Sequence, residues 1–509
     1  MTATPDDWKS GLDLAADTFR KQLVDRGFHD DGELLYGTIN WPDGKQQKSA
    51  RISVELTSSF PFAPPKVRIV ESDIEPTFHI ERNDGSPLCL WTSDVAVDSA
   101  PWRDVGKFLD WVAGWFINTD EGWPGDNDAD LERYLESDNR TFIRYNIDNL
   151  EAGRYYRTQQ LSEDVVAIKQ ELSWKPNPSH KKNRGIRRRE RGLCFVVDIG
   201  KVDIPIRNLT DLALATGSDL HELLKLVQLG SVEYLLISYK RGDRPANLVI
   251  GFKANGELKA YESADSSIQT RELRGGNQLS AYSKKKVIIV GCGAIGSHIA
   301  EILYRSGVKS MLLVDPERLR PGNIIRHLCG DEYIGQHKVV AVRNKLATLG
   351  MDPSMIRISD TRIGDPESTL ELLKEYDIVI DTTADMRATA VMTWCTEKLE
   401  SRLVTVCLQR EGGIARVDRF PLWDGETHLA PIPNLPGSTP AYEKGCGSPV
   451  SLTPPLSVVK AAALGAQVIL DELKMYNTLP ATMLEIIQAQ PDEPYSKIKL
   501  MTSEEHTDA

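Results

Sequence analysis

Several features that mark membrane-bound or secreted proteins are missing from this 509-residue sequence. No uninterrupted apolar run reaches the roughly 20 residues that a bilayer-spanning helix needs. Residues 1–7 lack the basic and apolar regions of a signal peptide. The seven cysteines are scattered and odd in number, which suits reduced thiols rather than a disulfide framework. We therefore expect a cytoplasmic protein with no membrane partner.

Excess positive charge and paired cysteines are missing as well. The formal net charge is −12, so we expect no general affinity for nucleic acid. The one basic run, residues 181–189, is interpreted as a solvated linker or a contact for a partner. Because no cysteines are spaced as paired Cys-x-x-Cys, we expect no structural zinc site.

The chain is long enough for several hydrophobic cores, and we expect an α/β multidomain protein. A polar stretch with a helical pattern, residues 149–172, predicts a helix ahead of the basic run. The expected segments are an α+β domain of residues 1–150, a helical and basic linker of residues 151–189, a small α+β module of unknown role at residues 190–275, an α/β domain of residues 276–495 and a polar tail of residues 496–509.

A glycine-rich turn lies between a predicted buried strand, residues 287–290, and a predicted helix, residues 297–303. Its glycines are Gly291, Gly293 and Gly296. Glycines permit a tight turn and close backbone approach, and the following helix presents free N–H groups to an anion. By itself this pattern fits NAD and flavin enzymes as well as ATP enzymes.

Polar residues downstream separate these possibilities. Asp315 ends the next predicted strand, where a carboxylate can hold the ribose hydroxyl of any nucleotide. Asn323 and Arg326 follow as Asn-x-x-Arg, and Lys338 ends a Gly-x-x-Lys element. The two cations lie where a triphosphate would be, and a dinucleotide has little use for both. The pattern therefore favours ATP and disfavours an NAD-dependent oxidoreductase.

These elements, within residues 287–346, closely resemble the adenylation domain shared by ubiquitin-activating enzymes and ThiF-type adenylyltransferases. The resemblance implies a Rossmann-like domain with a mainly parallel sheet, ATP and Mg²⁺ as cofactors, and a homodimer. Residues 376–385 resemble that family's later strand, whose terminal Asp binds magnesium. One residue more than usual separates the two acids, so Asp381 and Asp385 both remain possible ligands, and we favour Asp385.

A second resemblance covers roughly residues 10–120. The sequence of residues 60–67, Phe-Pro-Phe-Ala-Pro-Pro-Lys-Val, and the ten-residue spacing from His79 to Cys89 are similar to a ubiquitin-conjugating enzyme. This implies an α+β domain in which Cys89 carries an acyl group as a thioester. The family's His-Pro-Asn triplet reads His-Ile-Glu here, so the Asn that polarises the oxyanion is missing, and Asn83 is a possible substitute.

Cys446 lies between two glycines in a proline-rich loop, where the backbone can move and present the thiol. In thioester-forming activating enzymes, a loop that crosses the adenylation site bears the catalytic cysteine at this place. The alternative is a remnant of the cysteine-rich loop of ThiF relatives. Cys292, inside the glycine turn, is interpreted as a small residue packed beneath the nucleotide, and Cys407 as a core residue.

The order of the two domains resembles the fused conjugating–activating proteins of bacterial antiphage operons that make cyclic-oligonucleotide signals (CBASS). That resemblance implies adenylation of a protein C-terminal carboxylate, a thioester at Cys446, transfer to Cys89 and amide formation on a target amine. The modified protein would be a CD-NTase-type nucleotidyltransferase. The alternative is a sulfur-carrier adenylyltransferase in cofactor biosynthesis, with residues 1–150 as a binding module. The sequence identifies neither the substrate protein nor the acceptor.

Overall fold

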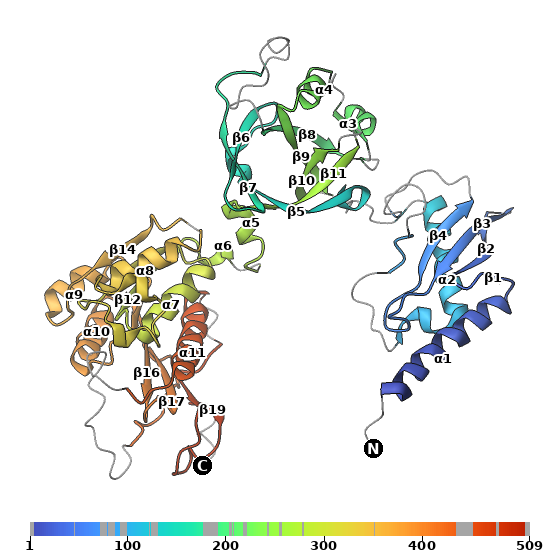
Figure 1. The fold of residues 1–509 in the computed structure, drawn as a ribbon. Helices are drawn as coiled ribbons and strands as arrows, with labels where there is room; N and C mark the ends of the chain where they lie inside the picture. The colour runs from blue at the N-terminus through green and yellow to red at the C-terminus, as the bar shows by residue number, and fades with distance from the viewer. Residues whose placement is uncertain are drawn as a thin grey trace. The chain divides into compact units, whose positions relative to one another are not determined.

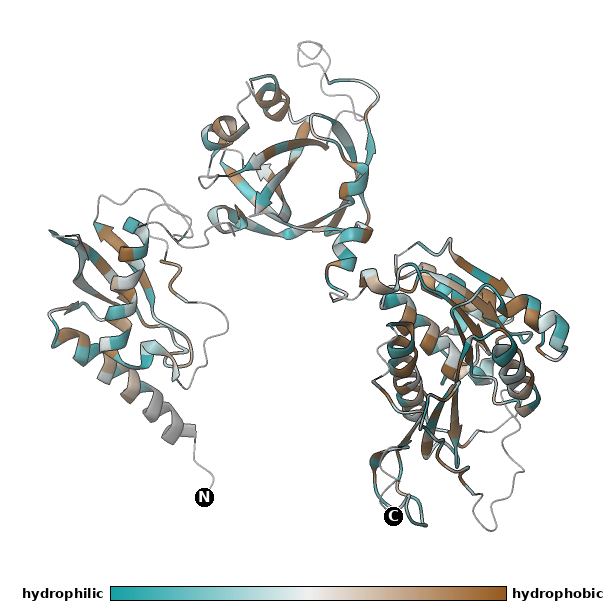
Figure 2. Ribbon diagram, turned by 180° about the vertical axis from the view of Figure 1, so that it is seen from behind, coloured by the Kyte–Doolittle hydropathy of each residue, from teal (hydrophilic) through white to brown (hydrophobic). Residues whose placement is uncertain are grey.

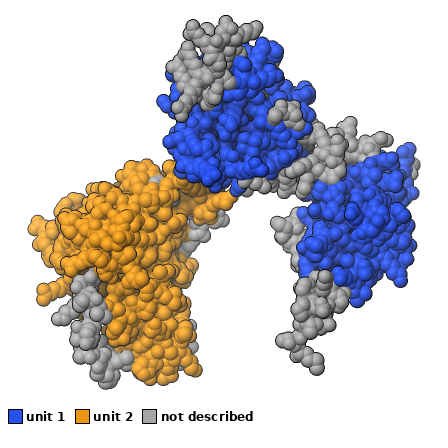
Figure 3. Space-filling model, viewed as in Figure 1, with its two compact units in different colours: residues 1–267 blue, residues 268–509 orange. Residues whose placement is uncertain are grey.

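The chain divides into two compact units, Met1–Ser267 and Ile268–Ala509 (Figure 3). In the part that the structure describes, no helix has both the length and the apolar character needed to cross a membrane. The structure is a computed structural model, and it describes residues 5–44, 46–71, 79, 87–91, 99–121, 123, 131–176, 192–202, 206, 208–216, 221–241, 244–253, 257–276, 279–350, 352–433, 451–474 and 478–503.

The first unit begins with a four-stranded antiparallel sheet in the order β1-β2-β3-β4, accompanied by two long helices (Figure 1). Apolar side chains from both helices and from the sheet form one core, which includes Phe19, Phe108 and Ile52. The elements are α1 (Pro5–Val24), β1 (His29–Asp30), β2 (Leu34–Asp43), β3 (Gln46–Glu55), β4 (Lys66–Glu71), the short helix η2 (Pro101–Arg103) and α2 (Val105–Glu121).

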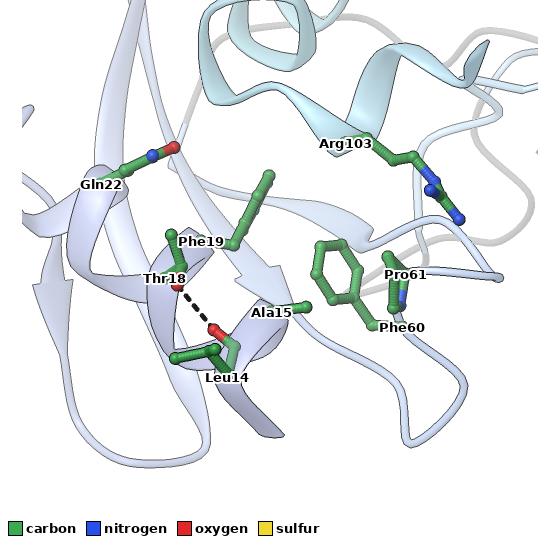
Figure 4. Close-up of a pocket in the computed structure, with 8 residues that line it drawn as sticks. All are labelled: Leu14, Ala15, Thr18, Phe19, Gln22, Phe60, Pro61 and Arg103. Carbon is green, nitrogen blue, oxygen red and sulfur yellow. Dashed lines mark hydrogen bonds between the residues drawn. The ribbon is translucent and has the colours of Figure 1, made fainter. Parts of the chain in front are cut away.

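The proline-rich turn before β4 packs against α1. Phe60 and Phe19 approach with ring centroids 5.0 Å apart. The Trp102 indole nitrogen donates to the Pro61 carbonyl at 2.9 Å. A cavity of about 380 Å³ lies between α1, this turn and η2 (Figure 4), and its lining residues are Leu14, Ala15, Thr18, Phe19, Gln22, Phe60, Pro61 and Arg103. Ring packing and one hydrogen bond thus hold the proline-rich turn in place.

The same unit also contains a closed barrel with the strand order β10-β11-β5-β7-β6-β8-β9 (Figure 1). Every strand contributes a side chain to one buried cluster, which includes Tyr145, Tyr156 and Tyr234, so this cluster fills the barrel. A second cluster joins the strands to α3 (Leu209–Thr216) and α4 (His221–Gln228). The strands are β5 (Glu136–Tyr145), β6 (Tyr155–Gln160), β7 (Val165–Glu171), β8 (Leu193–Lys201), β9 (Val232–Arg241), β10 (Arg244–Phe252) and β11 (Leu258–Asp265).

The helix predicted over residues 149–172 is wrong, because this stretch forms β6 and β7. Their tyrosines and β-branched residues suit strands, and pairing with β5 and β8 outweighs the local helical pattern. The barrel also differs from the expected division at residues 150 and 190. It takes β5 from before the first boundary and β8–β11 from after the second, so residues 190–275 are not a separate α+β module.

The second unit is built on an eight-stranded sheet in the order β14-β13-β12-β15-β16-β17-β18-β19. The first five strands in this order are parallel and the last three pairings are antiparallel, so the sheet is mixed rather than mainly parallel. The strands are β12 (Lys286–Val290), β13 (Ser310–Val314), β14 (Ile356–Ser359), β15 (Ile378–Asp381), β16 (Arg402–Gln409), β17 (Ile414–Phe420), β18 (Thr482–Ile486) and β19 (Lys499–Thr502).

Helices cover both faces of this sheet. Val287 and Ile289 of β12 pack into a cluster with α7, α8 and α11, whereas Ile288 and Val290 pack into a cluster with α9 and α10. β12 is therefore apolar on both faces, as a central parallel strand must be, and the sheet strands are largely apolar in Figure 2. The helices are α5 (Ile268–Glu272), α6 (Leu279–Tyr282), α7 (Ala294–Arg305), α8 (Lys338–Ala347), α9 (Pro366–Leu373), α10 (Met386–Lys398) and α11 (Pro455–Lys474).

The polar tail expected at residues 496–509 begins later than predicted. Lys499–Thr502 form β19, which pairs antiparallel with β18. Met501 is buried in a small apolar cluster with Leu484 and Tyr495. Burial of this one apolar residue and pairing with a sheet edge order the segment, although its composition is polar.

Candidate nucleotide and thioester sites

A cavity of about 200 Å³ opens where the parallel strands β12, β13, β14 and β15 end. β13 and β14 lie on one side of β12, and β15 lies on the other, so the strand order reverses here. In open α/β sheets, ligands bind outside the carboxyl ends of the strands at this point. The lining residues are Val290, Gly291, Gly293, Val314, Asp315, Pro316, Glu317, Lys338, Thr361, Arg362, Ile363, Thr382, Thr383, Asp385 and Ala388.

The glycine turn is fixed by close backbone contacts. Gly291 has a φ of +92°, which disfavours any side chain. A Cβ atom on Gly296 would lie 1.9 Å from the Gly291 carbonyl oxygen, so Gly296 serves packing within the turn and does not line the cavity. Thr382 Oγ1 donates to the same carbonyl at 2.6 Å. Gly293 caps the N-terminus of α7, and the N–H groups of that terminus favour an anion.

Asp315 joins the turn to the next strand. Its carboxylate accepts hydrogen bonds from the backbone N–H groups of Cys292 and Glu317, both at 2.8 Å. Burial raises the pKa of Asp315, and the Lys338 ammonium opposes that rise. Each carboxylate oxygen keeps a lone pair for a ribose hydroxyl, which is the role that the sequence predicted. Cys292, in the glycine turn, is fully buried, and burial raises its pKa well above the usual value.

Lys338 is a buried cation that forms an ion pair with Glu317. The sequence did not predict this partner. Its Nζ lies 2.5 Å from Glu317 Oε2, and its side chain is only 2% exposed against 50% for that of Glu317. The Lys338 hydrogen bond lowers the pKa of Glu317. Both residues line the cavity. A bound triphosphate would therefore compete with Glu317 for the Lys338 ammonium.

We expect Glu317→Gln to lower the apparent KM for ATP by about 5-fold, because it removes an anion that competes for Lys338. That factor corresponds to about 1 kcal/mol, the size of a partly exposed ion pair. ATP titrations of ATP–pyrophosphate exchange measure the change. The matched control is Glu371→Gln, which removes an exposed surface pair with Lys374 and should leave the KM unchanged. A higher KM in Glu317→Gln would mean that Glu317 orients Lys338 for the nucleotide.

Two predicted residues lie outside the cavity lining. Asn323 Oδ1 accepts from the Arg320 backbone N–H at 3.0 Å and closes the short helix η8 (Pro321–Asn323). The Arg326 guanidinium donates to Ser451 Oγ. In this structure the two side chains thus stabilise neighbouring parts of the chain and do not line the cavity.

The two candidate magnesium ligands differ in their surroundings. Asp381 is buried and accepts hydrogen bonds from the Thr383 backbone and hydroxyl and from the Thr389 hydroxyl. Asp385 is exposed, lines the cavity and uses Oδ1 to cap α10. Among the described residues there is no group of three or more His, Cys, Asp or Glu side chains that could hold a metal. A single accessible carboxylate still fits Mg²⁺, which keeps several waters and takes substrate phosphates as ligands.

His327 and Arg362 were also missed by sequence reasoning. His327 Nε2 donates to the Cys292 carbonyl at 2.8 Å, and Nδ1 accepts from the Cys329 backbone N–H at 3.0 Å. Burial lowers the pKa of His327 to about 4, so the ring is neutral at pH 7 and supports the glycine turn as a donor. Arg362, in the loop after β14, adds a second cation to the cavity lining beside Lys338. No local pattern in the sequence marks either residue.

In the first unit, Cys89 is partly exposed, and its backbone N–H donates to the His79 carbonyl at 2.8 Å. The backbones of His79 and Cys89, ten residues apart in the sequence, are thus in contact. Burial raises the pKa of the five other described cysteines, which makes them poor nucleophiles: Cys194, Cys292, Cys329, Cys395 and Cys407. Cys446, Asn83 and the basic run lie outside the described residues.

Comparison with known proteins covers part of the second unit. Residues 265–428 match the ThiF family. This match and the strand order place a Rossmann-type ThiF adenylation fold in the second unit. The family's nucleotide elements predicted from the sequence all lie inside the matched residues, and Cys446 lies beyond them.

Curated relatives include a ubiquitin transferase-like protein and a sulfur carrier protein adenylyltransferase. The ATP-dependent ubiquitin transferase-like protein Cap2 of Enterobacter hormaechei is 33% identical over 127 residues, which cover 24% of this chain and 21% of that protein. The sulfur carrier protein adenylyltransferase of Thermus thermophilus is 25% identical over 165 residues, which cover 31% of this chain and 60% of that protein. The chain therefore spans about a fifth of the length of this Cap2.

A further curated relative is the adenylyltransferase and sulfurtransferase MOCS3 of Xenopus laevis. It is 30% identical over 100 residues, which cover 19% of this chain and 22% of that protein.

Among solved structures, Escherichia coli MccB with ATP is 17% identical to this chain, with a TM-score of 0.33. The alignment covers 44% of this chain and 64% of MccB.

Proposed function

We propose that this chain is an ATP-dependent enzyme that activates a protein C-terminal carboxylate and conjugates it to a target amine. The observation that carries the adenylation step is the cavity at the ends of β12–β15, inside the ThiF-matched residues. It brings together Gly291, Gly293, Asp315, Lys338 and Asp385, which the sequence assigns to nucleotide and magnesium binding.

In the first step a carboxylate oxygen of the substrate attacks the α-phosphorus of ATP, and pyrophosphate leaves. Lys338 neutralises phosphate charge, and Asp315 holds the ribose. Asp385 would hold Mg²⁺, which supplies further charge neutralisation. The assignments of Asn323 to nucleotide positioning and of Arg326 to phosphate binding rest on the family resemblance, because neither lines the cavity.

Two thiols then carry the acyl group. The Cys446 thiolate attacks the adenylated carbonyl and AMP leaves, then the Cys89 thiolate attacks the new thioester and Cys446 leaves. An amine nitrogen finally attacks the Cys89 thioester, which forms the amide and releases the thiolate. Partial exposure of Cys89 and its contact with His79 support its role. The role of Cys446 rests on the sequence alone.

The substrate in this proposal is a CD-NTase-type nucleotidyltransferase in CBASS antiphage defence, and the enzyme acts as a cytoplasmic homodimer. The similarity to Cap2 supports the ubiquitin-like conjugation chemistry. The runner-up is a sulfur-carrier adenylyltransferase, which the similarity to the Thermus thermophilus protein favours. In that case residues 1–150 are a binding module without catalytic activity. Cys89 and Cys446 then do not both carry acyl groups.

ATP–pyrophosphate exchange tests the adenylation step. With Mg²⁺ present, we expect labelled pyrophosphate to enter ATP only when a candidate substrate protein with a free C-terminal carboxylate is added. The same protein with an amidated C-terminus is the control, because an amide cannot attack the α-phosphorus. Tight binding of NAD together with no binding of ATP would overturn the proposal.

A further inference from the structure

The Glu317 carboxylate covers the ammonium that a phosphate of ATP would need. Glu317 Oε2 lies 2.5 Å from Lys338 Nζ, and the Lys338 side chain is buried. The two backbones are also joined, because the Lys338 N–H donates to the Glu317 carbonyl at 2.9 Å. The two segments are therefore held together, and a phosphate reaches Lys338 only when the Glu317 side chain turns away from it.

A carboxylate that turns away from Lys338 needs another cation. Without one, Glu317 would be an unpaired anion beside a triphosphate, and the like charges would repel each other. The Glu317 side chain is half-exposed, so it has room to rotate. A second cation within its reach would remove the cost of leaving Lys338.

Arg362 lies in the segment next to Glu317. β13 and β14 are parallel, with Val314 opposite Ser359, and the Asp315 N–H donates to the Ser359 carbonyl at 3.1 Å. Glu317 and Arg362 follow this pair at equal distances along their two segments. Both residues line the cavity. The ends of two neighbouring strands thus bring the carboxylate and the guanidinium to the same side of the cavity.

The charge of Arg362 acts on Glu317. The Lys338 hydrogen bond makes the largest contribution to lowering the pKa of Glu317, and the charges of Arg320 and Arg362 lower it further. Arg320 does not line the cavity. Within the described structure the Arg362 guanidinium forms no hydrogen bond or ion pair, so it is available to a carboxylate.

Arg362 is remote from the expected place of the α-phosphate. The glycine turn and the N-terminus of α7 follow β12, and β13 separates β12 from β14. Neighbouring strands are about 4.8 Å apart, so the ends of β12 and β14 are about 10 Å apart. The position of Arg362 therefore suits contact with the side chain at the end of β13 better than contact with the anion at the glycine turn.

We propose that Arg362 is a positioning residue for ATP, which binds the Glu317 carboxylate when a phosphate of ATP binds Lys338. This inference rests on the proposed adenylation activity. Without nucleotide, Glu317 pairs with Lys338. In the nucleotide complex Glu317 pairs with Arg362, and the Lys338 charge is left to the phosphate. Arg362 thus favours ATP binding through Glu317 and does not itself touch the reacting atoms.

A double-mutant cycle in the full-length chain tests this inference by ATP titrations of ATP–pyrophosphate exchange. We expect Arg362→Gln alone to raise the apparent KM for ATP by about 5-fold, the factor that one partly exposed ion pair gives. The rate at saturating ATP should not change. In the Glu317→Gln background, Arg362→Gln should leave the KM unchanged, because no carboxylate remains to be moved. Arg362→Lys keeps the charge and should keep the KM near the wild-type value.

Arg357→Gln is the matched control, because Arg357 lies on β14 and forms an exposed pair with Glu375. It should leave the KM unchanged. A rise by the same factor in both backgrounds would mean that Arg362 contacts the nucleotide directly, and it would overturn the inference. An unchanged KM in Arg362→Gln alone, or a lower rate at saturating ATP, would also overturn it. No exchange in the wild-type chain would instead overturn the proposed function.

Discussion

Replacing Lys338 by alanine is expected to lower ATP–pyrophosphate exchange by about 10²-fold or more, because it removes a positive charge from the site where phosphate charge develops. The effect should be large since Lys338 is buried and its ammonium is held in the cavity by Glu317. Lys338→Met keeps an unbranched side chain of similar length without the charge. It should lower the rate of exchange by the same factor. Exchange of labelled pyrophosphate into ATP measures both variants.

The control for this prediction is Lys345→Ala, on the same helix α8 and away from the cavity lining. It should keep the wild-type rate of exchange. Equal losses in Lys345→Ala and Lys338→Ala would assign the effect to the stability of α8. Near-normal exchange in Lys338→Met would show that the charge of Lys338 takes no part in adenylation.

The second large effect concerns the order of the two thiols. Adenylation needs no cysteine, so Cys446→Ala should still exchange pyrophosphate while failing to load Cys89. Cys89→Ala should accumulate the substrate on Cys446 as an adduct that a reducing thiol cleaves. Amide product should disappear in both variants, because a thiolate must take the acyl group from the adenylate and pass it on. Non-reducing intact-protein mass spectrometry distinguishes the adducts.

Cys407→Ala is the control for the thiol experiment. Burial raises the pKa of Cys407 to about 11, so its thiol is un-ionised at neutral pH and should carry no adduct. This variant should load Cys89 and form amide as the wild type does. Loading of Cys89 at the normal rate in Cys446→Ala would mean that the acyl group passes directly from the adenylate to Cys89.

Local sequence was sufficient for the parts of the site that depend on one strand–turn–helix. The apolar run before Gly291 and the acid after β13 predicted β12, α7 and the place of Asp315, because each signal lies within a few residues. The Lys338–Glu317 pair and the His327 contact join residues on different elements, and no spacing rule connects them. The position of Arg326 beside Ser451 likewise depends on a contact between distant parts of the chain.

The barrel was not predicted for the same reason. β5 pairs with β11, so Tyr145 lies beside Asp265, and this pairing leaves no trace in local hydrophobic periodicity. The local sequence pattern of β6, taken alone, predicts a helix. Its Tyr156 becomes an interior residue of the barrel only when the strands on both sides pair with β6.

The closed barrel decides where this chain can be divided without damage. A cut at residue 150 or 190 would separate strands that pair with each other, and it would expose the tyrosine-rich interior to water. Fragments made at those points would therefore be aggregation-prone halves rather than domains. Recombination, whether in the laboratory or in a genome, can exchange the N-terminal domain only at a junction before β5, or the adenylation domain only at a junction after β11.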